Sequence, residues 1–230
     1  MITGALIAGV ATGAISYPLV MPNVQWFGPV TYRGRMDGPG RVALTFDDGP
    51  CPGGTDRILD LLKRLNVRAT FFVIGQNVEA HPELLKRIDS EGHLIGNHSF
   101  DHPAFGFLKG QAYWREQLER TDAAIERCIG KKPALFRPPL GLKTPAMLKA
   151  AAGYRTITWT RRAMDGLTTS PHKILHRLTG STKAGDVVAL HDGISPQSNR
   201  DPNATVRAVE PLVMRLRERG LEPVRLDELL

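Results

Sequence analysis

The sequence predicts an α/β fold, a single-domain distorted (β/α) barrel with about seven strands. The first observation behind this prediction is that short apolar segments with the character of buried strands alternate with helix-like segments from residue 42 onward. Such alternation implies parallel strands joined by helical crossovers. The second observation is the length, because 230 residues are fewer than a regular eight-unit barrel usually takes. We therefore expect an irregular barrel.

The first half of the barrel begins with a buried strand that the turn residues Gly49 and Pro50 close. A helix follows, for which Thr55 or Asp56 is the expected cap. Pro82 lies near the start of the second helix, where a proline is tolerated. In chain order, strands and helices are predicted at Val42–Phe46, Thr55–Leu65, Ala69–Ile74, Glu79–Glu91 and Leu94–Asn97.

Two long helices dominate the second half, and each is followed by a glycine, Gly130 or Gly220, which commonly ends a helix. Between these helices, Pro138 and Pro139 end a strand. The elements of this half are expected at Gln111–Ile129, Leu135–Arg137, Thr144–Ala152, Thr156–Thr160, Pro171–Leu178, Val187–Leu190, Ala204–Arg219 and Pro223–Leu226.

Residues with reactive side chains follow the predicted strands. Asp47 and Asp48 come directly after the first strand, and His98 and His102 follow the third at a spacing of four. This spacing puts both imidazoles on one side of a helical turn or a tight loop. Two imidazoles and one carboxylate are the usual protein ligands of a hydrolytic zinc, with the fourth position open to water. The spare carboxylate can act as a base.

Several motifs occur in a fixed order along the chain. They are T-F-D-D-G-P at Thr45–Pro50, H-S-F-D-H at His98–His102, F-R-P-P-L-G at Phe136–Gly141, Trp159 with Asp165 six residues on, and A-L-H-D at Ala189–Asp192. Together they resemble the polysaccharide deacetylases, the NodB-homology family also called carbohydrate esterase family 4. The resemblance extends from Arg41 to Leu230, and it implies the same distorted barrel.

The resemblance implies a metal site. Its ligands are the second aspartate of the D-D-G motif and both histidines, which are Asp48, His98 and His102 in this chain. A divalent metal is expected there, with zinc as the default and cobalt or nickel as alternatives. Asp47 is then the general base that takes a proton from the attacking water. Arg137 is implied to pair with Asp47 and to orient it.

The resemblance also implies an oxyanion donor and a general acid. The backbone N–H of Leu140 is the implied oxyanion donor. His191 is the implied acid that protonates the leaving amine, and Asp165 pairs with His191. Three positions depart from the family pattern. Leu140 replaces a usual tyrosine, Gly166 a frequent tryptophan, and Ala189 the leucine of the acetyl pocket. These departures put the choice of sugar and acyl group in question, and Trp159 is assigned either to the core or to the site wall.

Three functions follow as hypotheses. The leading one is a metal-dependent hydrolase that removes N-acetyl groups from an amino-sugar polymer or oligomer such as peptidoglycan or a chitin-like chain. A second is a deacylase or deformylase of a lipid-linked amino sugar. The third is a catalytically silent carbohydrate-binding protein, against which the joint presence of Asp47, Arg137 and His191 argues, because a binder needs neither a base nor an acid.

The net charge of +7 and the isoelectric point near 9.7 favour contact with anionic surfaces such as cell-wall polymers. No nucleic-acid motif accompanies this charge, so no nucleic-acid partner is predicted. Two cysteines, Cys51 and Cys128, are too few for a disulfide framework, and their pairing is left open. The oligomeric state is also left open.

The N-terminal segment at residues 2–21 carries no charge. It is read as a membrane anchor, an export signal or an apolar arm packed on the domain. We therefore divide the chain into an N-terminal segment with its connector, residues 1–36, and a catalytic domain, residues 37–230. The expected location is the cell envelope, by anchoring or export. A positive-inside reading of Arg33, Arg35 and Arg41 would instead leave the domain in the cytoplasm.

Overall fold

The structure is a computed structural model that describes residue 17 and residues 19–36, 40–195 and 201–230. Most of the apolar segment at 2–21 lies outside the described residues, and so do residues 37–39, where the predicted catalytic domain begins. No described helix combines the length and the apolar character that a membrane crossing requires.

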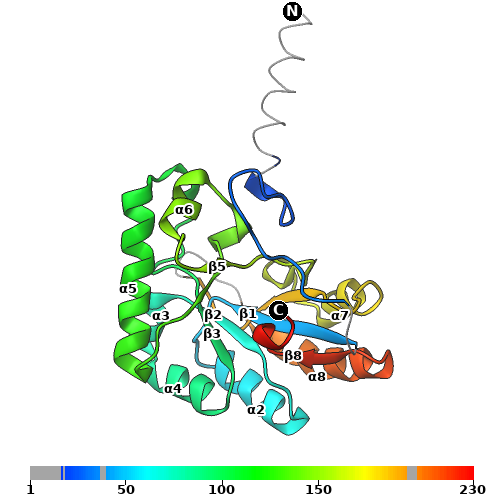
Figure 1. Ribbon diagram of the computed structural model, residues 1–230. Coiled ribbons are helices and arrows are strands. Elements are labelled where there is room, and N and C mark those ends of the chain that lie inside the picture. The colour runs from blue at the N-terminus through cyan, green and yellow to red at the C-terminus, as the bar shows by residue number, and fades with distance from the viewer. Residues whose placement is uncertain (1–16, 18, 37–39, 196–200) are drawn as a thin grey trace, which may run out of the picture.

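A curled parallel sheet forms the centre of the protein, with helices around it (Figure 1). Seven strands pair in the order β5-β4-β3-β2-β1-β7-β6, and β8 pairs with the first half of β1. Every ladder is parallel. The predicted distorted barrel is therefore confirmed, in the form of a curled half-barrel. The strands are β1 (Arg41–Asp47), β2 (Thr70–Val73), β3 (Leu94–Asn97), β4 (Leu135–Phe136), β5 (Arg155–Thr156), β6 (Arg161–Arg162), β7 (Val187–His191) and β8 (Glu222–Val224).

The helices cover the outside of the sheet because each has one apolar face. They are α2 (Thr55–Leu65), α3 (Gly75–Ala80), α4 (Pro82–Ser90), α5 (Gln111–Ile129), α6 (Pro145–Ala150), α7 (Pro171–Thr179) and α8 (Asn203–Glu218). In α2, the buried side chains Ile58, Leu59 and Leu62 return at helical spacing toward the sheet. The strands supply the other half of the core, where Phe46 of β1 stacks on Phe71 of β2 with ring centroids 5.2 Å apart.

Two predicted elements are divided in the structure. The helix expected at Glu79–Glu91 is replaced by α3 and α4, because Pro82 begins a new helix and His81 between them is not helical. The strand expected at Thr156–Thr160 is replaced by β5 and β6, which pair with β4 and β7 at opposite edges of the sheet. The chain passes from one edge to the other here, so the residues between them leave the ladder.

Two smaller predictions concern a helix cap and the cysteines. No side chain caps α2, whose N-cap residue is Gly54 rather than Thr55 or Asp56. Cys51 and Cys128 do not form a disulfide with each other. In α6, Thr144 is the N-cap residue, and its hydroxyl accepts a hydrogen bond from the backbone N–H of Met147.

His93 makes the stability of this fold depend on pH. Its ring is buried against Phe71, and its Nδ1 accepts a hydrogen bond from the backbone N–H of Ala69 at 3.0 Å. Burial lowers the pKa of His93 from 6.5 to about 4. Between these two values the unfolded chain binds more protons than the folded chain. Stability is therefore complete above the unfolded pKa and falls as the pH decreases toward 4.

We expect His93 alone to lower the free energy of unfolding by about 2 kcal/mol between about pH 7 and about pH 5. His93→Asn keeps an acceptor for the Ala69 N–H but cannot titrate, so its stability should depend less on pH. Denaturant unfolding of both proteins at the two pH values measures the difference. Equal pH dependence in the two proteins would contradict the expectation.

Candidate active site

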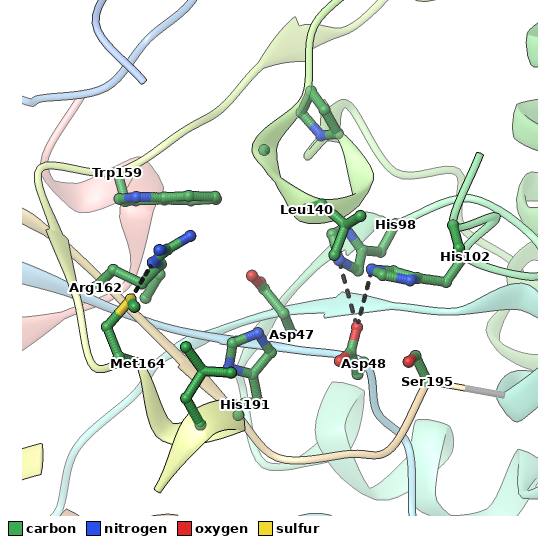
Figure 2. A pocket seen from close by; sticks show the side chains of 16 residues that line it. Asp47, Asp48, His98, His102, Leu140, Trp159, Arg162, Met164, His191 and Ser195 are labelled. Atoms are coloured by element: carbon green, nitrogen blue, oxygen red, sulfur yellow. Dashed lines mark hydrogen bonds and ion pairs between the residues drawn. The ribbon is translucent and has the colours of Figure 1, made fainter. Parts of the chain in front are cut away.

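A cavity of about 430 Å³ opens at the carboxyl ends of the strands, which is the face where α/β barrels place their active sites. Many residues singled out in the sequence line it, among them Asp47, Asp48, His98, His102, Leu140, Gly166, Ala189 and His191. Arg137 and Asp165 lie buried directly behind Asp47 and His191. Trp159 also lines the cavity (Figure 2), and it packs against a cluster of buried core residues, so it belongs both to the site wall and to the edge of the core.

Asp48, His98 and His102 form a compact cluster of potential metal ligands. Asp48 follows β1, and both histidines lie on the loop that follows β3. The Asp48 Oδ1 atom lies 3.5 Å from the Nε2 atoms of both His98 and His102. One ligand atom of each residue lies within 4.8 Å of the other two, and all three side chains are buried. No helical turn is needed to bring the histidines together, because Ser99 and His102 adopt positive φ values of 69° and 50°.

The protonation of this cluster suits a divalent cation. The His98 Nδ1 lies 2.8 Å from the carbonyl oxygen of Arg137. A carbonyl can only accept, so Nδ1 donates, and in the neutral ring Nε2 is left with a lone pair toward Asp48. Burial lowers the pKa of His102 to about 4, against the opposing charge of Asp48. Burial would raise the pKa of Asp48, but its contacts with the imidazoles of His98, His191 and His102 hold it well below its usual range.

The neighbouring carboxylate, Asp47, is held by a buried arginine. Arg137 Nη1 lies 2.6 Å from Asp47 Oδ1 and also donates to the Thr45 hydroxyl at 2.8 Å. Its Nη2 donates to the Thr158 carbonyl at 3.2 Å, and the guanidinium lies 4.0 Å from the centroid of the Phe72 ring. Burial lowers the pKa of Arg137, whereas the charge and hydrogen bond of Asp47 oppose that shift. These contacts fix the orientation of the Asp47 carboxylate.

His191 lies across the cavity at the end of β7, and a second buried carboxylate holds it. Its Nδ1 lies 2.7 Å from Asp165 Oδ1, and its backbone N–H donates to Asp165 Oδ2 at 2.8 Å. The Thr205 hydroxyl, on α8, donates to the same Oδ2 at 2.7 Å. A carboxylate accepts, so His191 Nδ1 donates, and in the neutral ring Nε2 carries the lone pair.

Leu140 belongs to a short 3-10 turn, Pro139–Gly141, on the rim of the cavity. It has a φ of 57°, and its side chain is 54% exposed. Ala189, on β7, lines the cavity and is fully buried. Gly166 lines the cavity as well, so all three positions that depart from the family pattern face the space that a substrate would occupy.

Asp192 fixes the turn that carries the D-D-G motif. Its Oδ2 accepts a hydrogen bond from the Thr55 hydroxyl at 2.5 Å, and its backbone N–H donates to the Asp47 carbonyl at 3.1 Å. A Cβ at Gly49 would lie 2.1 Å from Asp192 Oδ2, so only glycine fits there. Burial and the charges of Asp48 and Asp47 raise the pKa of Asp192 to about 7, against the hydrogen bond from Thr55.

The sequence analysis assigned no role to several residues that shape the site. Thr205 supports Asp165 from a helix 40 positions away, and no local pattern marks it. Arg162 and Met164 line the cavity, and a signal was present for these two, since both lie between Trp159 and Asp165 of one motif. Thr45 and Thr158 hold Arg137, and Thr45 lies within the T-F-D-D-G-P motif itself.

A parallel half-barrel whose strand ends carry an Asp-His-His cluster between an Asp47–Arg137 pair and a His191–Asp165 pair defines a class of protein, the metal-dependent hydrolases. A family model described as polysaccharide deacetylase matches residues 35–176. The chain belongs to the polysaccharide deacetylase family, and it is a carbohydrate N-deacetylase, a hydrolase of amide bonds. The resemblance and the enzyme class predicted from the sequence are confirmed.

Relatives and solved structures agree with this assignment. A peptidoglycan-N-acetylglucosamine deacetylase of Bacillus cereus is 36% identical over 197 residues, which cover 82% of this chain and 87% of the relative. A chitooligosaccharide deacetylase of Bradyrhizobium sp. is 34% identical over 197 residues, covering 82% and 90%. The crystal structure of a peptidoglycan N-acetylglucosamine deacetylase in complex with 4-naphthalen-1-yl-N-oxidanyl-benzamide matches with a TM-score of 0.80. Its identity is 32%, and the match covers 86% of this chain and 91% of that chain.

Proposed function

We propose that this protein removes N-acetyl groups from amino-sugar residues of peptidoglycan or of a chitin-like oligomer. The observation that carries the proposal is the placement of Asp47 with Arg137, and of His191 with Asp165, around one cavity that also holds the Asp-His-His cluster. The substrates named for the Bacillus cereus and Bradyrhizobium relatives support the choice of glycan.

Asp48, His98 and His102 are the proposed ligands of a divalent metal. When bound, such an ion lowers the pKa of a coordinated water toward neutrality and polarises the substrate carbonyl. Two neutral imidazoles and one carboxylate suit zinc, and cobalt or nickel fits the same donors. The hydrogen bond from His98 to the Arg137 carbonyl fixes both the ring orientation and the tautomer that the metal requires.

Asp47 is the proposed general base. Its carboxylate faces the cavity beside the cluster (Figure 2), and Arg137 prevents it from turning away. Asp47 takes a proton from the attacking water as the carbon–oxygen bond to the acetyl carbonyl forms. The backbone N–H of Leu140 is the proposed donor to the oxyanion that develops, and its place on the cavity rim allows this contact.

His191 is the proposed general acid. Its Nε2 delivers a proton to the sugar nitrogen as the carbon–nitrogen bond breaks, which releases acetate and a free amine. Asp165 stabilises the imidazolium form of His191, and Thr205 holds Asp165 in place. Because the base and the acid are separate groups on separate strands, one must be deprotonated and the other protonated at the same time.

Acetate release from an N-acetylglucosamine oligomer, measured before and after chelation, tests the proposed function. We expect activity in the metal-loaded protein, loss of activity with a chelator, and recovery when zinc is added. Recovery with cobalt and nickel in parallel ranks the metals. Acetate release that survives complete removal of the metal would overturn the proposed role of the Asp-His-His cluster.

A second candidate concerns the acyl group. Ala189 leaves room at the base of the cavity, and two exposed apolar side chains, Leu140 and Leu167, stand on its rim. This lining favours a second substrate class, the lipid-linked amino sugars, from which the same residues would remove an acyl or formyl group. A series of N-formyl, N-acetyl and N-butyryl glucosamine oligomers distinguishes the candidates. Ala189→Leu should lower the rate on the butyryl substrate more than the rate on the acetyl one.

We also propose that residues 37–230 are the catalytic domain and that the protein acts in the cell envelope, as an anchored or exported enzyme. The peptidoglycan named for the Bacillus cereus relative supports this location. The uncharged segment at residues 2–21 is the proposed membrane contact. Fractionation of cells that produce the full chain, compared with a chain lacking residues 1–36, tests both proposals.

The pH dependence of the rate should report the base and the acid. We expect a bell-shaped profile, whose acidic limb belongs to the Asp47 and metal–water system and whose basic limb belongs to His191. Asp165→Asn should move the basic limb to lower pH, because the His191 imidazolium loses the carboxylate that stabilises it. Initial rates across the pH range check this. If the basic limb of Asp165→Asn stays at the same pH while His191→Ala is inactive, His191 has a role other than the acid that Asp165 supports.

A further inference from the structure

One wall of the cavity carries a positive charge that the proposed reaction does not use. Among the sixteen residues that line the cavity in the described part of the chain, Arg162 is the one arginine or lysine. It belongs to β6, where it pairs with Ala189 of β7, two residues before His191. Figure 2 shows its guanidinium below Trp159, across the cavity from His98 and His102.

Arg162 is held in position without an acidic partner. Its Nε donates to the Met164 sulfur at 2.9 Å, and its guanidinium carbon lies 5.7 Å from the centroid of the Trp159 ring. The preceding residue, Arg161, pairs instead with Asp186 at 3.0 Å, outside the cavity. The described residues provide no such ion pair for Arg162. Its two terminal nitrogens therefore stay available, and they form the fork that matches a carboxylate.

The other charged groups of the cavity are already committed. Asp47 is paired with Arg137, and Asp48 belongs to the proposed metal cluster. A substrate that carries a negative charge would supply the ion-pair partner that Arg162 lacks among the described residues. Neutral chitin-like chains carry only hydroxyls and amides. Every second sugar of a peptidoglycan glycan instead bears a lactyl group, whose carboxylate is free wherever no peptide is attached to it.

We propose that Arg162 binds a carboxylate carried by the glycan next to the sugar that loses its acetyl group, so that the enzyme selects carboxylated over neutral amino-sugar chains. This inference rests on the proposed function and narrows its substrate class. The carboxylate enters beside Trp159 and Met164, and the N-acetyl group reaches the Asp-His-His cluster on the opposite wall.

Three tetrasaccharides test the proposal with the full, metal-loaded chain. They are an N-acetylglucosamine tetramer, a tetramer that alternates N-acetylglucosamine with N-acetylmuramic acid, and the methyl ester of that second tetramer. We expect kcat/KM for the free acid to exceed that for the ester on the order of tenfold at low salt. The preference should shrink as ionic strength rises, because the bound pair is partly exposed.

Variants assign the preference to one side chain. Arg162→Gln should lower kcat/KM for the acid to the level of the ester, while Arg162→Lys should keep part of the preference. Arg215→Gln is the matched control, since Arg215 is exposed on α8 and does not line the cavity. This variant should retain the full ratio of acid to ester.

Two results would overturn the proposal. One is equal use of acid and ester by the unaltered protein. The other is an Arg162→Gln variant that loses activity equally on all three substrates, because a uniform loss indicates a structural role. Either result leaves the deacetylase function in place. Absence of acetate release from all three tetrasaccharides by metal-loaded protein would instead contradict the proposed function itself.

Discussion

His102→Ala should lose bound metal and activity together. Its Nε2 lies 3.5 Å from Asp48 Oδ1 within the proposed ligand cluster, and no other described histidine can replace it there. Two remaining ligands hold a divalent ion weakly. We expect activity to fall by more than about 100-fold, beyond the usual cost of losing a group that only supports a ligand. Metal content by mass spectrometry and acetate release measure the two losses.

His172→Ala is the matched control, because His172 is exposed on α7 and lies outside the cavity. It should retain one metal ion per chain and full activity. Retention of stoichiometric zinc by His102→Ala would refute the ligand assignment. Loss of metal from both variants would mean that the metal content falls because the protein is destabilised, and not because a ligand is missing.

Asp47→Asn should keep its metal and lose most of its turnover. The amide cannot take a proton, and general base catalysis is typically worth about 10²–10⁴-fold in rate. The substitution also leaves the buried Arg137 opposite a neutral group, so the melting temperature should fall. Activity is therefore compared per folded, metal-loaded molecule, well below the melting temperature.

The control for this variant is Asp60→Asn, which removes an exposed carboxylate on α2. Its ion pair with Arg87 lies at the surface, so little stability and no activity should be lost. An unchanged rate in Asp47→Asn would mean that another group takes the proton. A variant without metal would place Asp47 among the ligands.

Local patterns were sufficient to predict much of the fold. The bounds of α2, β3 and α5 agree with the prediction residue by residue, because the signals that set them, such as apolar periodicity and Gly130 directly after α5, are local in the sequence. The prediction was wrong at Glu79–Glu91, where Pro82 starts a second helix instead of lying inside one. It was also wrong at Thr156–Thr160, because a partner switch between two sheet edges depends on the whole sheet.

The same distinction applies to the site. Asp47, Asp48, His98 and His102 could be grouped from the sequence because each follows a strand of one parallel sheet, and the structure brings them together. The roles assigned to them stay predictions. Thr205 could not be found, since only the tertiary packing of α8 brings its hydroxyl to Asp165. Arg162 could have been found, because a cation between Trp159 and Asp165 was visible in the motif.

Five of the six described non-glycine residues with positive φ lie at the site: Asp48, Ser99, His102, Leu140 and Met164. Branching at Cβ is strongly disfavoured in this conformation. At Leu140 and Met164, which line the cavity, valine, isoleucine and threonine are therefore poor replacements whatever the substrate. Substitutions that adapt this enzyme to new glycans are therefore expected at these positions to be glycine, asparagine or residues with unbranched or γ-branched side chains. In a saturation library at Leu140 and Met164, the active clones should carry residues of these types.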